Sequence, residues 1–390
     1  MLSVQSRRRL SAAVFIAAGL LSPCAQAQAV RAETLATRLE NPWGLAFLPE
    51  GRFLVTERAG RLRVIAPDGQ IGASVKGLPD IAVGGQGGLL DVVADSDFAR
   101  NRRIFFCFSE PAATGRANST ALASATLSAD FTRLEDTRIV FSQKPKVAST
   151  AHFGCRIVEG RLPGANGQPD GKLFLTLGDR FSRKEDAQKL DNHHGKVIRI
   201  NKDGSVPQDN PFVGRSGALP EIWSYGHRNV QGATLAPDGA LWTHEHGPQG
   251  GDEINLPRPG LNYGWPEITY GENYGGGKIG EGLSQKAGME QPLHHWVPSI
   301  APSGMVFLTS ERYGKAWQGN LFIGSLKFSY LDRLELSGPF KGPVAQEHKL
   351  LTDVAERIRD VRQGPDGLLY VLTDSTNGKL IRLQPVQAGK

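Results

Sequence analysis

The feature that most constrains the fold of this chain is a sixfold repetition of a turn followed by a short apolar run. A second apolar run precedes the turn in most copies, as at 44–47 and 305–308, and a third often follows, as at 60–65. Runs of this length, bounded by glycine, proline and asparagine, are typical of β-strands joined by tight turns. The six copies occupy residues 48–56, 101–108, 169–176, 237–243, 318–324 and 365–373.

Each copy is predicted to form a short antiparallel sheet that cannot bury both of its faces alone. Six such sheets packed radially cover one another, which gives an all-β, six-bladed β-propeller with four-stranded antiparallel blades. A two-sheet sandwich is the alternative, but a sixfold repeat fits it poorly. The copies lie about 50 residues apart at first and about 70–80 apart around the fourth and fifth, so the excess is expected in loops on the propeller faces. The best helix signal is the short stretch 185–190, and residues 30–390 are expected to form one domain.

The N-terminus has the pattern of an export signal. Arg7-Arg8-Arg9 form a positive segment, residues 10–21 form an apolar one, and Ala27 and Ala29 offer small-residue cleavage sites. The apolar segment is too short to span a bilayer and nothing later replaces it, so we expect residues 1–29 to be removed and the protein to be periplasmic or secreted. A lipid anchor at Cys24 is the alternative, which the proline before it disfavours.

Charge and cysteine usage exclude several classes of function. Residues 1–29 carry three arginines and no acidic residue, so their removal lowers the formal net charge from +6 to +3. No basic run survives, which argues against a nucleic-acid partner. Of three cysteines only Cys107 and Cys155 remain, either as a disulfide or as two separate buried thiols. No Cys-x-x-Cys, haem or Gly-x-Ser-x-Gly pattern is present, so thiol-redox, haem and serine-hydrolase chemistry lack support.

The stretch 242–255 reads Trp-Thr-His-Glu-His-Gly-Pro-Gln-Gly-Gly-Asp-Glu-Ile-Asn. It begins as a strand and becomes a loop rich in glycine, whose carbonyls together with Asp252 and Glu253 are the oxygen ligands that calcium prefers. His244 and His246 alternate on the strand and also fit zinc, but no third ligand stands at a zinc spacing. The alternative is a surface turn with a solvated acidic pair.

Further polar residues fall between the apolar runs. A glycine nest at 84–88 surrounds Gln86, and no helix follows it, so a nucleotide site is rejected. Arg357 and Arg359 alternate around Ile358 and are expected to face the same way. Several cations aimed at one place, next to an acidic loop, indicate a small ligand rich in carboxylates or carbonyls. For each arginine a blade-to-blade salt bridge stays open, and for a lone histidine such as His152 a structural role stays open.

Taken in order, these motifs resemble the soluble aldose sugar dehydrogenases of the glucose/sorbosone type, which use pyrroloquinoline quinone (PQQ) and calcium. The resemblance spans residues 41–383 and implies a six-bladed propeller. The matching stretches are Asn-Pro-Trp-Gly-Leu-Ala-Phe at 41–47, the nest at 84–88, His152 with its following glycine, Leu-Gly-Asp at 177–179, Gly-His-Arg-Asn at 226–229, His-Gly-Pro-x-Gly-Gly-Asp-Glu at 246–253, Asn-Tyr-Gly-Trp-Pro at 262–266, Ala-Pro-Ser-Gly at 301–304 and Arg-Ile-Arg-Asp-Val at 357–361.

The resemblance implies a role for individual residues. His152 is the base that removes the proton from the anomeric hydroxyl, so that hydride passes from C1 to the quinone and the sugar becomes a lactone. Arg228 polarises the accepting carbonyl, and Gln86 orients substrate and quinone. The residues implied to bind the cofactor are Gln86, Arg228, Asn229, Pro302, Ser303, Gly304, Lys327, Arg357 and Arg359. Gly247 and Pro248 are implied to ligate a calcium at the cofactor, and Glu253 and Tyr263 to ligate a second, structural calcium.

The implied partners are aldose sugars and an external electron acceptor, with no membrane span and a monomer or homodimer. Two departures from the family pattern leave the preferred sugar open. Arg180 stands where some glucose-oxidising members have glutamine, as a larger cation expected near the sugar, and residues 271–291 match nothing assigned. A calcium-dependent propeller lactonase, and a non-catalytic propeller that binds glycans or proteins, are the rival functions.

Overall fold

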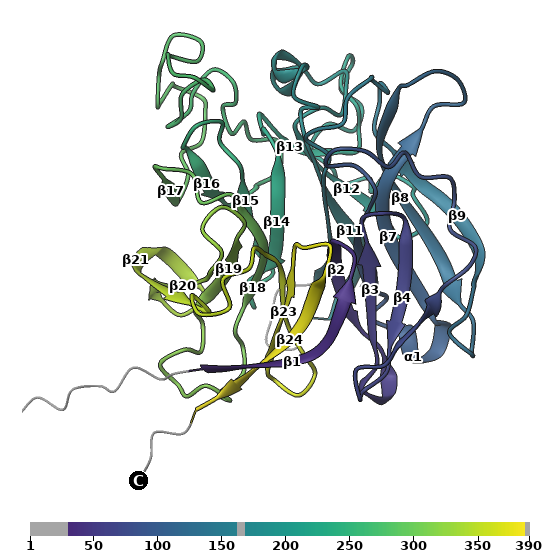
Figure 1. Ribbon diagram of the computed structural model, residues 1–390. Helices are drawn as coiled ribbons and strands as arrows, with labels where there is room; N and C mark the ends of the chain where they lie inside the picture. Colours follow the sequence, from purple (N-terminus) through teal and green to yellow (C-terminus); the bar gives the residue numbers. More distant parts are fainter. Residues whose placement is uncertain (1–29, 162–167, 387–390) are drawn as a thin grey trace, which may run out of the picture.

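The computed structural model describes residues 30–161 and 168–386. It contains six four-stranded antiparallel sheets arranged in a ring, so the predicted six-bladed β-propeller is confirmed and the sandwich is wrong (Figure 1). The export signal expected at residues 1–29 lies outside the described residues. Within the described residues, no helix is long and apolar enough to cross a membrane.

The first five blades each follow the chain from the propeller axis outward. They comprise β2 (Pro42–Phe47), β3 (Phe53–Glu57), β4 (Arg61–Ile65) and β5 (Ile71–Ser74); β6 (Leu89–Ala94), β7 (Arg103–Pro111), β8 (Asn118–Leu127) and β9 (Leu134–Ser142); β10 (Gly154–Arg161), β11 (Pro169–Leu177), β12 (Lys196–Asn201) and β13 (Ile222–Tyr225); β14 (Val230–Leu235), β15 (Leu241–Glu245), β16 (Asp252–Asn255) and β17 (His294–Trp296); and β18 (Pro302–Phe307), β19 (Leu321–Ser325), β20 (Leu331–Gly338) and β21 (Lys341–Leu350).

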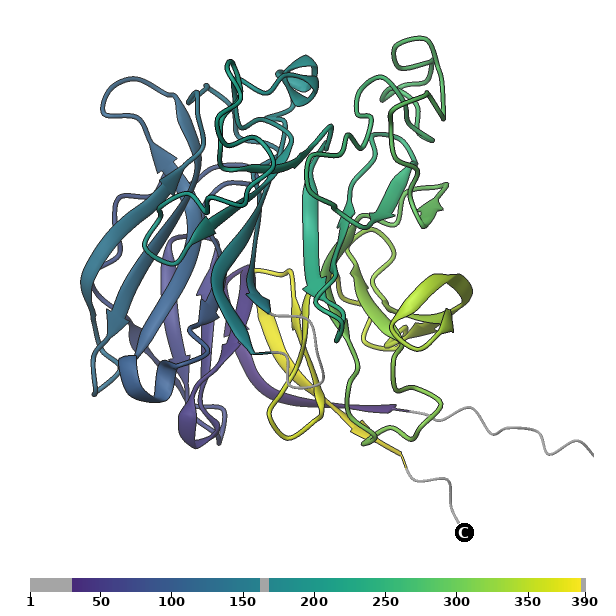
Figure 2. The ribbon, with the colours of Figure 1, turned by 180° about the vertical axis from the view of Figure 1, so that it is seen from behind.

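The sixth blade is completed by the N-terminal strand. β22 (Ile358–Gln363), β23 (Leu369–Thr373) and β24 (Gly378–Pro385) come from the end of the chain, and β1 (Val30–Leu39) pairs antiparallel with β24. The two strands lie side by side in both views (Figures 1 and 2). This pairing joins the two ends of the described chain within one sheet, so the ring is closed by backbone hydrogen bonds and the edge of β24 is covered.

The predicted repeat corresponds to the second strand of every blade, namely β3, β7, β11, β15, β19 and β23. These strands read as nearly continuous apolar runs because neighbouring blades cover both of their faces. Among residues 30–161 and 168–386, helix is confined to three short segments: η1 (Pro49–Gly51), α1 (Phe98–Asn101) and η2 (Lys184–Gln188). The last of these coincides with the expected helix at 185–190, but it is a single 3₁₀ segment.

Cys107 of β7 and Cys155 of β10 form a disulfide with their Cα atoms 5.8 Å apart. The alternative of two separate thiols is therefore wrong. The bond joins the second and third blades close to the axis, and both residues are buried.

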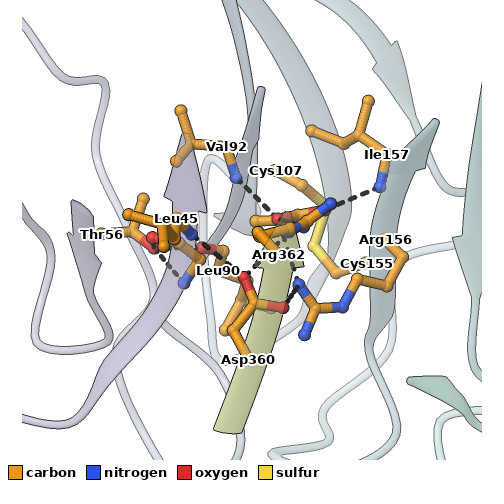
Figure 3. Close-up of polar contacts among 12 residues, drawn as sticks. Leu45, Thr56, Leu90, Val92, Cys107, Cys155, Arg156, Ile157, Asp360 and Arg362 are labelled. Atoms are coloured by element: carbon orange, nitrogen blue, oxygen red, sulfur yellow. Dashed lines mark hydrogen bonds and ion pairs between the residues drawn. A yellow bond between two sulfur atoms is a disulfide. The ribbon is translucent and has the colours of Figure 1, made fainter. Parts of the chain in front are cut away.

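A buried ionic network lies at the inner strands next to this disulfide (Figure 3). Arg156 of β10 pairs with Asp91 of β6 at 3.2 Å and with Asp360 of β22 at 3.0 Å. Arg362 of β22 pairs with the same two carboxylates, at 2.8 and 3.0 Å. Each carboxylate also accepts a backbone N–H from a neighbouring blade, Asp91 from Ile157 and Asp360 from Leu45. Charges buried in this way are tolerated because each is paired, and the network holds four inner strands in register around the axis.

Candidate functional site

A cavity of about 850 Å³ opens at the axis, where the inner strands begin. Every inner strand contributes to the wall of this cavity, because each places residues from its first two positions, or from the three positions before it, on the cavity. These residues are Trp43 (β2), Gln86 and Leu90 (β6), Phe153 and Gly154 (β10), Asn229 and Gln231 (β14), Ser299 and Ala301 (β18), and Arg357 and Arg359 (β22). The cations Arg58 and Lys327 complete a wall to which the described residues contribute no carboxylate.

The structure brings about half of the predicted site residues together in this wall. Those that line it are Gln86, Asn229, Gly247, Pro248, Lys327, Arg357 and Arg359. Those that do not are His152, Arg228, Pro302, Ser303, Gly304, Glu253 and Tyr263. His152, Arg228 and Pro302 each precede or follow a lining residue directly in the chain, whereas the other four do not.

His152 lies at the edge of the cavity, where its imidazole is held by a carboxylate. Its Nδ1 is 2.6 Å from Oδ1 of Asp179, which lies two residues beyond the end of β11. The approach requires Gly178, since a Cβ there would lie 2.1 Å from the carbonyl oxygen of His152. The backbone N–H of His152 donates to Oε1 of Gln86 at 2.8 Å, which ties the residue to the glycine nest. Within the described residues no hydrogen bond engages Nε2, so this nitrogen is left for a ligand.

The surroundings of His152 favour a neutral imidazole. Burial lowers its pKa, Asp179 partly offsets this by favouring the protonated ring, and the cations Arg228 and Arg180 lower the pKa further. Asp179 is itself fixed, because its carboxylate also accepts the Trp265 indole N–H at 2.8 Å and the Phe181 amide at 2.8 Å. A neutral imidazole with Nδ1–H directed at a carboxylate carries its lone pair on Nε2, as a general base requires.

Arg228 directly precedes Asn229, which lines the cavity, and its position is fixed by several hydrogen bonds. Its backbone N–H and the Nδ1 of His227 both contact the buried carboxylate of Glu245, which fixes the Gly-His-Arg-Asn turn. The guanidinium donates to the carbonyls of His246 and Gly247, at 3.0 and 2.9 Å, and lies 3.3 Å from the hydroxyl of Tyr274. The carbonyl predicted to ligate calcium at Gly247 is therefore engaged by an arginine in this structure.

Arg357 and Arg359 converge, as predicted, although Arg357 precedes β22 and a register irregularity lies between Ile358 and Asp360. Both guanidinium groups reach Oδ2 of Asp374, at 3.1 and 3.5 Å. Burial by itself would raise the pKa of Asp374, but Arg359, Asn41 and Arg357 outweigh it and hold the pKa at about 2. The salt bridges lie within one blade, and both arginines still line the cavity.

The segment 302–304 lies beside the wall. The carbonyl of Pro302 accepts from the imidazole of His246 at 2.6 Å, and the Ser303 hydroxyl donates to the carbonyl of Ile358 at 2.6 Å. A Cβ on Gly304 would meet the carboxylate of Asp360 at 2.3 Å, so this glycine serves the packing of β18 on β22. Ser299 and Ala301, just before the segment, are the residues that line the cavity.

The acidic loop places Glu253 near Glu245 and Asp252. Burial, and then the neighbouring Glu245, raise the pKa of Glu253 well above its usual range. The Tyr263 hydroxyl is hydrogen-bonded to the Leu256 carbonyl and the Arg258 amide, so only its backbone carbonyl is open to a metal. The part of the chain that the structure describes contains no group of three or more His, Cys, Asp or Glu side chains arranged for a metal ion, and zinc at His244 and His246 gains no support.

Sequence reasoning missed several residues of the site. Asp179 and Trp43 both lie in motifs that the sequence analysis quoted, but neither was assigned a role. An acidic residue shortly after a strand could have indicated Asp179 as the partner of a histidine. Trp43 lines the cavity with the guanidinium carbons of Arg156 and Arg359 at 4.2 and 5.5 Å from its ring centroid. Tyr274 comes from the unmatched stretch 271–291 and no signal pointed to it. Arg180, expected near the sugar, is fully buried and absent from the cavity wall.

This propeller, with a cation-lined axial cavity and a carboxylate-held histidine, matches a known family over nearly its whole length. The family model described as Glucose / Sorbosone dehydrogenase matches residues 39–382. The chain therefore belongs to the glucose/sorbosone dehydrogenase family.

Individual relatives agree with this assignment. The chain is 46% identical to the aldose sugar dehydrogenase YliI of Escherichia coli over 360 residues, which cover 91% of this chain and 93% of that protein. The apo-form structure of the soluble aldose sugar dehydrogenase from Escherichia coli superimposes with a TM-score of 0.85 at 44% identity, covering 92% of this chain and 100% of that one. The PQQ-bound aldose sugar dehydrogenase of Streptomyces coelicolor gives a TM-score of 0.72 at 27% identity, covering 92% and 98%.

Proposed function

We propose that this protein is a quinoprotein that oxidises the C1 hydroxyl of aldose sugars to the lactone and passes the electrons to an external acceptor. The observation that carries the proposal is the His152–Asp179 pair at the edge of a cavity whose charged lining is entirely cationic. Family membership and the printed activities of the relatives support the substrate class.

The cavity suits PQQ, an aromatic quinone that carries three carboxylates. Lys327, Arg357, Arg359 and Arg58 would hold these carboxylates, because charge-assisted bonds from several cations favour a polyanion. Trp43 offers an aromatic surface in the same wall. When bound, the quinone supplies the two-electron acceptor for the C1 hydride.

His152 would accept the proton of the anomeric hydroxyl at Nε2, while Nδ1–H stays bonded to Asp179. The positive charge that forms on the ring is then stabilised by the adjacent carboxylate. Arg228 would place its guanidinium where negative charge develops on the accepting oxygen. The side-chain oxygen of Gln86 is occupied by the His152 amide, which leaves its NH₂ group to orient a sugar hydroxyl.

Calcium is proposed at two places. At the cavity, the donors would be the Pro248 carbonyl and the second lone pair of the Gly247 carbonyl, whose first lone pair accepts from Arg228. The described wall adds no anionic ligand, so this ion would depend on the carboxylates of the bound quinone. At the loop, Glu253 and the Tyr263 carbonyl would hold a structural ion. An uncompensated carboxylate there, close to Glu245 and Asp252, is the observation that favours a cation.

Export to the periplasm or the medium is proposed for the same chain. The disulfide between Cys107 and Cys155 supports it, since such bonds persist in oxidising compartments.

The deciding experiment is dye reduction with a panel of aldoses, comparing apoprotein alone with apoprotein given quinone, calcium or both. We expect turnover only with the quinone, and more of it with calcium present. Hydrolysis of lactones that needs calcium but no quinone would instead identify a lactonase, and sugar binding without turnover would identify a binding propeller.

A further inference from the structure

Arg180 is a buried cation without a carboxylate of its own. Its Nη2 donates to Oδ1 of Asn118 at 2.5 Å and to the carbonyl of Ser149 at 2.6 Å. Nε and Nη1 have no hydrogen-bond partner within the described residues. The adjacent carboxylate of Asp179 is occupied by other groups, and burial lowers the pKa of Arg180 to about 9. A guanidinium that is buried without an ion-pair partner destabilises the fold. We therefore look for a functional role for Arg180.

The contacts of Arg180 converge on residues 149–153, here called the base strap because His152 lies within it. At one end of the strap, Nη2 binds the Ser149 carbonyl and the Ser149 hydroxyl donates back to the Arg180 carbonyl at 2.9 Å. At the other end, the guanidinium carbon lies 3.6 Å from the centre of the Phe153 ring. That ring also packs on Gly87, where a Cβ would lie 2.7 Å from it. Both ends of the strap are thus fixed, with His152 between them.

The backbone around His152 adopts an unfavourable conformation that the surrounding contacts must stabilise. His152, Arg180 and Phe181 all have positive φ angles, of 51°, 59° and 64°. Non-glycine residues rarely adopt this left-handed conformation and keep it only where the surrounding structure dictates it. Phe181 additionally places its ring edge-on to the imidazole of His152, with the centroids 5.2 Å apart.

We propose that Arg180 is a positioning residue for the His152 base. Its buried guanidinium holds the base strap in the conformation that directs the imidazole of His152 toward the cavity. The inference rests on the proposed role of His152 in aldose oxidation. It assigns Arg180 to the placement of the base and not to contact with the sugar.

The test uses Arg180→Lys, which keeps the positive charge but loses the planar stack and the forked hydrogen bonds. The matched control is Arg333→Lys. Arg333 is also buried, donates to Asn320 at 2.6 Å, lies 4.7 Å from the Trp317 ring centre and has an unpartnered Nε. It lies on β20, however, and none of these contacts involves the base strap. Arg180→Lys should lower kcat roughly 10- to 100-fold with KM and quinone affinity within about twofold, because small displacements of a catalytic group cost this much. Arg333→Lys should lower Tm and leave kcat unchanged.

A second readout does not need the loaded enzyme. Hydrogen exchange followed by mass spectrometry on the apoprotein should show amides 149–153 exchanging at least about tenfold faster in Arg180→Lys, with the other blades unchanged. Ser149→Ala, a milder change, should give a smaller effect of the same kind if Arg180→Lys does not fold. Unchanged strap exchange and unchanged kcat, or a kcat loss equal to that of Arg333→Lys, would overturn the inference. If the parent protein turns over no aldose, the proposed function fails by itself, while the exchange experiment still decides whether Arg180 clamps the strap.

Discussion

Nδ1 of the His152 imidazole lies 2.6 Å from Oδ1 of Asp179, so the carboxylate accepts the hydrogen bond of the Nδ1–H group. The Trp265 indole and the Phe181 amide also donate to this carboxylate and hold it in place. The pair therefore fixes both the tautomer and the orientation of the histidine, the arrangement that a base needs before any substrate arrives.

His152→Ala should lower kcat by roughly 10²–10⁴-fold, because general-base catalysis contributes this much. Quinone affinity should be retained, since the cations that would hold the cofactor line the cavity and His152 does not. Steady-state kinetics and a quinone titration measure the two quantities. A well-folded His152→Ala protein with the parent's turnover would end the assignment of the base.

The dependence of activity on pH should reflect the protonation of His152. Burial lowers the pKa of His152, so the neutral ring dominates at pH 7 and activity should be lost only as the pH falls below the usual imidazole value of about 6.5. Asp179→Asn removes the charge that favours the protonated ring, so it should move this acid limb to lower pH. It should also lower kcat severely, because the amide no longer enforces the tautomer. An acid limb that moves upward in Asp179→Asn would contradict the pairing.

Lys327 is the cleanest probe of the cofactor site. Replacing Arg357 or Arg359 would leave the carboxylate of Asp374 short of a partner. Lys327 has no carboxylate partner among the described residues, and its ammonium lies 5.2 Å from the centre of the Phe328 ring. Lys327→Met should weaken quinone binding roughly 10- to 100-fold, the worth of one charge-assisted bond of about 1.5–3 kcal/mol. The melting temperature should not change. Equal quinone affinity in parent and variant would remove Lys327 from the site.

The architecture was predictable because it is repeated locally. Each second strand carries its own turn and its own apolar run, so six weak signals reinforce one another. β1 was not assigned, since its place depends on meeting β24 more than 300 residues later, and nothing near Val30 encodes that partner. Chain closure of this kind is a property of the whole ring.

The sequence predicted those site residues that belong to local motifs, but not the contacts between residues far apart in the chain. Gln86, Lys327, Arg357 and Arg359 were expected at one cavity and lie there. The partner of His152 is 27 residues away and the residue that binds its amide is 66 away, separations at which spacing carries no information. Arg180 was placed near the sugar because it follows a motif, but a positive φ at this position turns its side chain inward to Asn118 and Phe153. Backbone conformation, which composition does not reveal, decided that outcome.

Calcium should stabilise the fold if Glu253 ligates it. A ligand that binds only the folded state raises Tm with its saturation, so excess chelator should lower the Tm of the parent. Glu253→Gln lacks the carboxylate and should show a Tm that neither calcium nor chelator changes. Differential scanning calorimetry of both proteins with and without calcium tests this, and identical responses would place any bound calcium elsewhere.

The disulfide should contribute to stability more than to chemistry. Cys107 and Cys155 are 48 residues apart, and closing a loop of this size in the unfolded chain contributes about 4 kcal/mol in the chain-entropy treatment. Cys107→Ala/Cys155→Ala should therefore lose roughly 2–5 kcal/mol of unfolding free energy, measured by denaturant titration. Each single variant should lose a similar amount, because either change breaks the bond. The quinone affinity of the folded double variant should stay at the parent's value, since neither cysteine lines the cavity. A double variant as stable as the parent would show that the pairing of β7 with β10 is already fixed by the blades themselves.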